Sequence, residues 1–176
     1  MFFIFQSALV RTHNVKWHRF FGWFGAGLGT VMVPLGLATA VVMARFESYQ
    51  LHVAGRDRFL IVPFYEMLAF GACFTLAVLW RKKPELHRRL IFIATCTLLA
   101  AAFARFSVGL RTTGLFYPCV DGMIALGAIR DLLVNRKIHK VYGIALPAMM
   151  VAQCFVVYTW QSGAHWWLRI ADGILR

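Results

Sequence analysis

Long apolar runs separated by short basic stretches dominate the pattern along the chain. A helix rises about 1.5 Å per residue, so about 20 apolar residues are needed to cross roughly 30 Å of hydrocarbon. Five runs approach that length, at residues 20–44, 59–80, 90–110, 118–133 and 141–160. The fourth is the shortest and contains Asp121 and Arg130, so neighbouring helices must shelter it from lipid. The pattern predicts an all-α fold, a polytopic transmembrane helix bundle that forms a single domain over residues 1–176.

Shorter helical segments flank the five predicted spans. Residues 2–10, FFIFQSALV, are apolar but too short to cross a bilayer, so we expect a partial N-terminal helix there. In residues 164–176, Trp167, Ile170 and Ile174 recur at helical spacing, while charged residues share another face. A short amphipathic helix of this kind is typical of the membrane surface, so we predict a C-terminal interfacial helix at residues 164–176.

Composition supports a membrane protein and indicates its orientation. Hydrophobic residues make up 60% of the sequence and charged residues only 15%, which excludes an ordinary soluble domain. The net charge of +12 would suggest a nucleic-acid partner in a soluble protein, but here the basic residues flank apolar runs, so no nucleic acid is expected. Residues 1–19, 81–89 and 130–140 together hold twelve of the 19 Lys and Arg, and six lie on the other side. This bias predicts a cytoplasmic (inner) membrane protein whose basic loops are cytoplasmic.

A histidine followed by a basic residue begins each helix that is predicted to run outward from the cytoplasm. The three pairs are His18-Arg19, His87-Arg88 and His139-Lys140. A cation is unfavourable at the positive end of a helix dipole, so either topology demands these charges or they bind an anion such as a lipid headgroup. Neutral imidazoles offer a third interpretation, a divalent metal or haem site with Asp131 as an orienting carboxylate. The sequence leaves these interpretations open.

Three stretches carry most of these helix-end residues. They are HRFFGWFGAGLGTVMVPLGLATA, ELHRRLIFIAT with Arg105 further along the same helix, and RDLLVNRKIHKVYG. Together they resemble an uncharacterised family of bacterial multi-pass integral membrane proteins, over most of the chain from about Gln6 onward. The resemblance implies fold and membrane location, and no activity or ligand. Further helices precede the matching region in that family, and FFIFQSALV is similar to the second half of such a helix. This implies an N-terminally truncated chain and leaves its natural start open.

Three ionisable residues inside the predicted spans are candidates for a functional site, because inserting a charge there costs about 3 kcal/mol. Glu66 lies about 10 Å from the outer end of its helix, and Arg105 about 22 Å from the inner end of its own, depths that nearly coincide in a core of about 30 Å. Asp121 lies near the outer end of the fourth span. We therefore expect Glu66, Arg105 and Asp121 to converge on one polar site, with Glu66 and Arg105 in contact or bridged by water. Such a site binds a substrate, an ion or a proton, or else it only fixes helix packing.

Three functions are compatible with these residues. The first is a bundle whose buried polar cluster serves small-solute or proton-coupled binding and transport. The second is a haem- or metal-binding redox membrane protein that uses the inner histidines, and the third is a non-catalytic membrane subunit. We find no Gly-rich phosphate loop, HExxH motif or nucleophile elbow, and the four cysteines are not spaced as a metal or redox pair. The sequence favours a protein without catalytic residues, with the lipid bilayer and anionic lipids as partners; a homo-oligomer or a membrane-complex partner stays open.

The charge bias makes a testable prediction of topology. A reporter fused after Lys83 or Arg136 should report a cytoplasmic position, and one fused after Gly55 or Thr113 should report the outer side. Paired reporters, one active only in the cytoplasm and one only outside it, measure this at each site. Reversal at two of the four sites would overturn the orientation.

Overall fold

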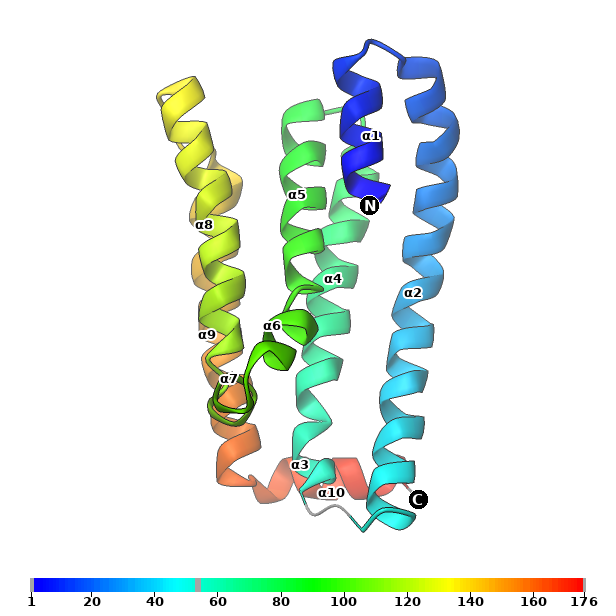
Figure 1. The fold of residues 1–176 in the computed structure, drawn as a ribbon, viewed down its shortest axis with the longest axis vertical. Helices are drawn as coiled ribbons and strands as arrows, with labels where there is room; N and C mark the ends of the chain where they lie inside the picture. The colour runs from blue at the N-terminus through cyan, green and yellow to red at the C-terminus, as the bar shows by residue number, and fades with distance from the viewer. Residues whose placement is uncertain (1, 53–54, 176) are drawn as a thin grey trace.

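The chain is almost entirely helical in the computed structural model, which describes residues 2–52 and 55–175. Within these ranges it forms ten helices and no strand. The helices are α1 (Phe2–Arg11), α2 (Val15–Tyr49), α3 (Arg56–Phe59), α4 (Ile61–Leu79), α5 (Pro84–Thr97), α6 (Ala100–Phe106), α7 (Val108–Thr113), α8 (Phe116–Asn135), α9 (Lys140–Ser162) and α10 (His165–Leu175). The long helices lie side by side, and α10 crosses one end of the bundle (Figure 1). The predicted all-α fold is confirmed. Four residues of the predicted domain, Met1, Val53, Ala54 and Arg176, lie outside the described residues.

Four helical segments are long and apolar enough to cross a membrane. They are Val15–Tyr49, Arg56–Leu79, Pro84–Phe106 and Lys140–Ser162. These segments correspond to four of the five predicted spans. The remaining prediction, residues 118–133, coincides with α8, whose 20 residues include Asp121, Arg130 and Asp131. Charged residues lower the hydropathy of α8, so it does not join the four on length and composition alone.

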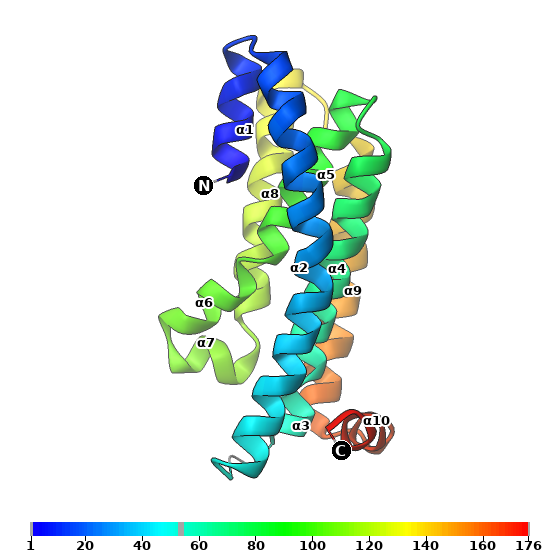
Figure 2. The ribbon, with the colours of Figure 1, turned by 90° about the vertical axis from the view of Figure 1, so that its right-hand side faces the viewer.

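The third predicted span is interrupted. We expect one helix over residues 90–110, but α5 ends at Thr97, and Ser107 has an extended backbone with φ −153° and ψ 149°. The Thr97 hydroxyl donates to the Ala94 carbonyl at 2.8 Å, and the Ser107 hydroxyl accepts from the Leu110 N–H at 3.2 Å, which caps α7. As a result α6 and α7 leave the line of α5 and project from the side of the bundle (Figure 2). The expectation of a single helix over residues 90–110 is therefore wrong.

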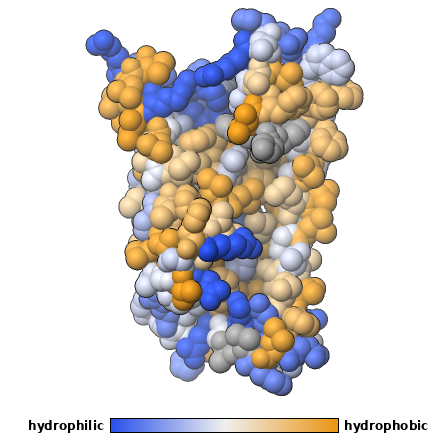
Figure 3. All heavy atoms as spheres, in the orientation of Figure 1, coloured by the Kyte–Doolittle hydropathy of each residue, from blue (hydrophilic) through white to orange (hydrophobic). Residues whose placement is uncertain are grey.

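Large apolar side chains face outward along the bundle. On α2, for example, Trp23, Leu35 and Val42 are 67%, 60% and 63% exposed. Hydrophobic atoms cover the middle of the face seen in Figure 3, hydrophilic atoms gather at its two ends, and a hydrophilic patch interrupts it over α6 and α7. A protein that folds in water buries such side chains, whereas hydrocarbon solvates them without cost. The surface therefore agrees with the apolar lengths of the four segments.

The short helix α10 packs against the end of the bundle opposite the α4–α5 connection (Figure 1). Its residues Trp167, Ala171 and Leu175 are buried at helical spacing. The Trp167 indole N–H donates to the Asp57 carbonyl in α3 at 3.1 Å. A helix is thus present at residues 165–175, within the predicted segment 164–176, but Trp167 from its predicted apolar face packs on the protein, while Ile170 remains 47% exposed.

The core lies where α4, α5, α8 and α9 pack together. Ile93 of α5 and Ile124 of α8 are fully buried at its centre. α4 packs against α5, and α8 packs against α5, α6 and α9. Buried polar side chains occupy the two ends of this core, one group near the break after α5 and one at the start of α5.

Candidate functional site

Four helices bring polar side chains around a small enclosed space, which we call the Glu66 cavity. Its polar lining residues are Tyr65 and Glu66 of α4, Thr97 of α5, Tyr117 of α8 and Gln153 of α9. The cavity has a volume of about 10 Å³, which is room for about one water molecule. The fold thus gathers residues that are far apart in the sequence into one polar site.

Glu66 is the ionisable carboxyl group of this cavity, and the residue is 9% exposed. Within the described part of the chain its carboxyl group makes no hydrogen bond or ion pair. Tyr117 is 3% exposed, and its hydroxyl also has no hydrogen-bond partner there. Buried polar groups without partners are uncommon and usually mark a water, an ion or a functional group. The cavity therefore offers an unpaired carboxyl and an unpaired hydroxyl to a water or a small ion.

Asp121 is connected to the Glu66 cavity through Gln153. The Gln153 amide Nε2 donates to Asp121 Oδ1 at 3.0 Å, and Gln153 is 4% exposed. Asp121 itself is half-buried on α8. The sequence-predicted residues Glu66 and Asp121 therefore belong to the same polar region. Gln153 was not predicted from the sequence, because it is a single uncharged amide within an apolar run.

Arg105 makes no direct contact with Glu66. It is exposed on α6, and its Nη1 donates to the Ala101 carbonyl of its own helix at 2.9 Å. Arg105 is close enough to act electrostatically on Glu66, but the two side chains form no ion pair. The break after Thr97 is the reason, because it turns α6 away from the face that α5 presents to the core. The predicted direct contact of Glu66 with Arg105 is therefore not formed.

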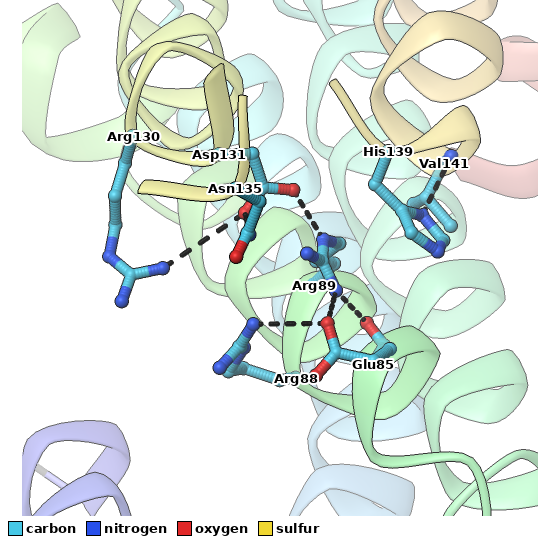
Figure 4. Close-up of polar contacts among 8 residues, drawn as sticks. All are labelled: Glu85, Arg88, Arg89, Arg130, Asp131, Asn135, His139 and Val141. Atoms are coloured by element: carbon cyan, nitrogen blue, oxygen red, sulfur yellow. Dashed lines mark hydrogen bonds and ion pairs between the residues drawn. The ribbon is translucent and has the colours of Figure 1, made fainter. Parts of the chain in front are cut away.

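A second polar cluster, at the start of α5, pairs a buried arginine with two carboxylates. Arg89 Nε donates to Asp131 Oδ2 at 2.6 Å, and the two side chains are only 4% and 2% exposed. Arg89 Nη1 also donates to the Glu85 carbonyl at 2.7 Å and to the Glu85 carboxylate. Asn135 Nδ2 donates to Asp131 Oδ1 at 3.3 Å. Figure 4 shows Arg89 between Glu85 and Asp131, where it joins α5 to α8.

The sequence contained a signal for this pair. Arg89 precedes the buried residues Ile93 and Cys96 by four and seven positions, so it lies on the core face of α5. Asp131 follows the buried Ile124 by seven positions and lies on the core face of α8. Arg89 entered the sequence prediction only as one of the basic residues that orient the protein in the membrane, so its spacing to Ile93 and Cys96 was not used.

The exposed arginines beside this cluster are also close to its carboxylates. Arg88 Nη2 donates to Glu85 Oε2 at 3.2 Å, and Arg130 Nη1 lies 4.0 Å from Asp131 Oδ1. The Arg88 and Arg130 side chains are 51% and 53% exposed, so these pairs add little stability. Arg88, which the sequence proposed as an anion ligand, therefore already has a counter-ion.

The three helix-start histidines have different roles in the structure. His87 Nδ1 donates to the Ala77 carbonyl of α4 at 2.8 Å, and His139 Nδ1 accepts from the Val141 N–H at 3.2 Å as the cap of α9. His18 is close enough to interact electrostatically with His87, and its Nδ1 is buried without a partner. His139 is thus engaged in its own helix end (Figure 4).

The structure does not assemble the metal site considered from the sequence. Among the described residues no three His, Cys, Asp or Glu side chains gather in a way that could hold a metal ion. The Asp131 carboxylate, expected to orient a histidine, instead binds Arg89. His18, His87, His139 and Asp131 are therefore not brought together as a metal-binding group in the described part of the chain.

Comparison with protein-family models, with curated proteins and with solved structures finds no match for this chain. The family resemblance of the helix-end motifs stays a prediction. Fold and site together define a helical protein with four helices long and apolar enough to cross a membrane. Most of its buried polar residues lie in two clusters, an ion-paired cluster at the start of α5 and the Glu66 cavity, where Glu66 has no cation among the described residues in contact with it.

The Arg89–Asp131 pair predicts strong coupling in stability. Arg89→Gln should lower the free energy of unfolding by about 3–5 kcal/mol, because it leaves Asp131 buried without its cation. The double variant Arg89→Gln with Asp131→Asn should lose less than the sum of the two single losses. Thermal unfolding of the purified protein in detergent measures this, and the exposed Arg130→Gln is the matched control. Additive losses would show that the pair is not formed.

The separation of Glu66 from Arg105 predicts that these two residues are not coupled in stability. Because the two side chains do not touch, the losses caused by Glu66→Gln and Arg105→Gln should add to within about 0.5 kcal/mol. The same unfolding measurement on the two single variants and the double variant tests this. A coupling of more than about 1 kcal/mol would mean that an ion pair forms in the membrane.

Proposed function

We propose that this chain is a multi-pass protein of the cytoplasmic membrane with five spanning helices and cytoplasmic basic loops. α8 is the fifth span, since 20 residues at about 1.5 Å each measure about 30 Å. Its two carboxylates bond to other helices, Asp131 to Arg89 and Asp121 to Gln153. They are thereby turned away from lipid, as charges inside a membrane protein usually are.

The arrangement of the connections supports five spans. Figure 1 draws the α1–α2, α4–α5 and α8–α9 connections at one end of the bundle and α10 at the other. Residues 1–19, 81–89 and 130–140, which hold most of the basic residues, fall at these three connections. The chain starts α2 at the end with the three basic connections and reaches α10 at the opposite end, so the helices from α2 to α9 must cross the bundle an odd number of times.

We infer that the Glu66 cavity binds and releases a proton as part of proton-coupled binding or transport. The observation that carries this inference is a buried carboxyl group that has no cation in contact with it. An ionised carboxylate in such a place is strongly unfavourable, so the neutral acid is the stable form until water or a cation reaches it. A carboxyl group of this kind changes charge when its surroundings change, which is what coupling requires.

The size of the cavity favours a proton over a solute. About 10 Å³ holds one water molecule, and it is far below the few hundred Å³ of a typical small-molecule pocket. A water there can accept the Glu66 proton and donate to the unpaired Tyr117 hydroxyl. Asp121 does not line the cavity but accepts a hydrogen bond from Gln153, which does.

Infrared difference spectroscopy tests this function directly. A pH step on the purified protein in lipid should produce a carboxylic-acid C=O band that shifts in heavy water, and Glu66→Gln should abolish that band. The control Asp121→Asn should keep it, because Asp121 is only half-buried and already accepts from Gln153. A wild-type protein without the band, or a band retained in Glu66→Gln, would favour a non-catalytic membrane subunit instead.

A further inference from the structure

An apolar groove lies on the hairpin formed by α1 and α2. Phe5 of α1 and Phe20, Phe21 and Phe24 of α2 line a hollow of about 360 Å³ without polar surface. The rings of Phe5 and Phe21 meet edge to face, with centroids 5.3 Å apart, and close its inner wall. Phe20 is 67% exposed, so the hollow opens to the outside of the bundle. α1 runs beside the first turns of α2 in both ribbon views (Figures 1 and 2).

Basic residues stand at the loop end of this groove without counter-ions. Lys16 precedes Phe20 and Phe24 by four and eight positions, so the three side chains share one stripe of α2. Arg11 ends α1 and Arg19 lies one turn into α2. In the part of the chain that the structure describes, none of these three cations forms an ion pair. The first acidic residue of the sequence is Glu47, near the opposite end of α2.

This contrasts with the basic cluster at the start of α5. There Arg88, Arg89 and Arg130 are accompanied by the carboxylates of Glu85 and Asp131. Among the described residues no carboxylate accompanies Arg11, Lys16 and Arg19 in this way.

Buried polar atoms on the same hairpin also lack partners. Both side-chain polar atoms of Gln6 and the Nδ1 atom of His18 are buried without a hydrogen bond. Gln6 directly follows Phe5 of the groove, and His18 lies between Trp17 and Arg19. The hairpin thus carries both an apolar groove and, within one residue of Phe5 and Arg19 along the chain, polar atoms without partners, as the binding of an amphipathic molecule requires.

We propose that the α1–α2 hairpin is a binding site for one anionic phospholipid, with an acyl chain in the phenylalanine groove and the phosphate on Lys16 and Arg19. The site rests on the proposed membrane orientation and does not depend on the Glu66 cavity. The cytoplasmic leaflet carries the anionic lipids that such a site needs. A second copy of this chain is a poor occupant, because its own hairpin carries the same uncompensated positive charge.

The site refines the expectation of anion binding at the helix-start pairs. Of the three helix-start pairs, only His18-Arg19 belongs to the proposed site. Arg88 is already paired with Glu85, and the imidazoles of His87 and His139 already bond to backbone groups. Lys140 lies on α9, outside the hairpin, and the groove gives it no part in the site.

Native mass spectrometry of the whole chain tests the headgroup part of the site. The probes are phosphatidylglycerol and phosphatidylcholine with identical acyl chains. Lys16→Gln with Arg19→Gln should weaken phosphatidylglycerol binding about fivefold for each charge removed, about 25-fold together. Phosphatidylcholine binding should fall much less, because its choline cation already offsets the charge of its phosphate. The matched control Lys82→Gln with Lys83→Gln removes the same charge from the α4–α5 connection and should have little effect. An equal loss in the control would overturn the site in favour of unspecific charge attraction.

Groove variants test the acyl-chain part. Phe20→Ala with Phe24→Ala should weaken the binding of both lipids, whereas Phe20→Leu with Phe24→Leu should restore it, since both residues are exposed and an apolar groove remains. An unchanged melting temperature confirms that these variants fold. Unchanged lipid binding in the alanine variant would overturn the proposal, as would a dimer that dissociates only in this variant, because the groove would then hold a second copy. Glu66→Gln should bind both lipids normally, so this test and the infrared test can fail independently.

Discussion

A polar or charged group withdrawn from water must find its partner within the protein, and this constraint determines how the helices pack. Arg89 illustrates it most clearly. Its guanidinium is satisfied by Glu85 on its own helix and by Asp131 on α8, so α5 and α8 are fixed in register at that end. A helix carrying Asp131 is unsuited to lipid by itself and becomes suited once that carboxylate is paired.

The same constraint separates the polar residues into three groups. The Arg89 cluster is satisfied internally and holds the helices together. The buried Tyr117 hydroxyl has no hydrogen-bond partner in the described part of the chain, and the Glu66 carboxyl group has no cation in contact with it, which suits a group that exchanges a proton. Lys16 and Arg19 stand at the surface without a counter-ion, which suits a group that binds an external anion. How completely a polar group is satisfied therefore indicates whether it serves structure, exchange or binding.

Much of the fold was predictable because length and hydropathy are local properties of the sequence. The apolar runs located α2, α4, α8 and α9 to within a few residues. The prediction of α8 was the weakest of these, because charged residues lower the hydropathy of that run. The break after Thr97 was not predictable, since Leu98 and Leu99 are ordinary helix formers and no proline or glycine marks the site. The position of Arg89 on the core face of α5 was predictable from its spacing to Ile93. Its place in the basic stretch 81–89, however, indicated only a role in membrane orientation.

The expected Glu66–Arg105 contact shows what depth in a membrane does and does not determine. Distance along the helix axis places two residues at the same level, but the direction in which a side chain points depends on unbroken helical geometry up to that level. Once α6 departs from α5, the 3.6-residue repeat no longer relates Arg105 to the core face. Arg105 is then left outside, and Glu66 keeps its unpaired carboxyl group. The irregular backbone thus adjoins the one-water cavity, while the rigid ion pair lies at the far end of α5, so the proposed proton site borders the least regular part of the bundle.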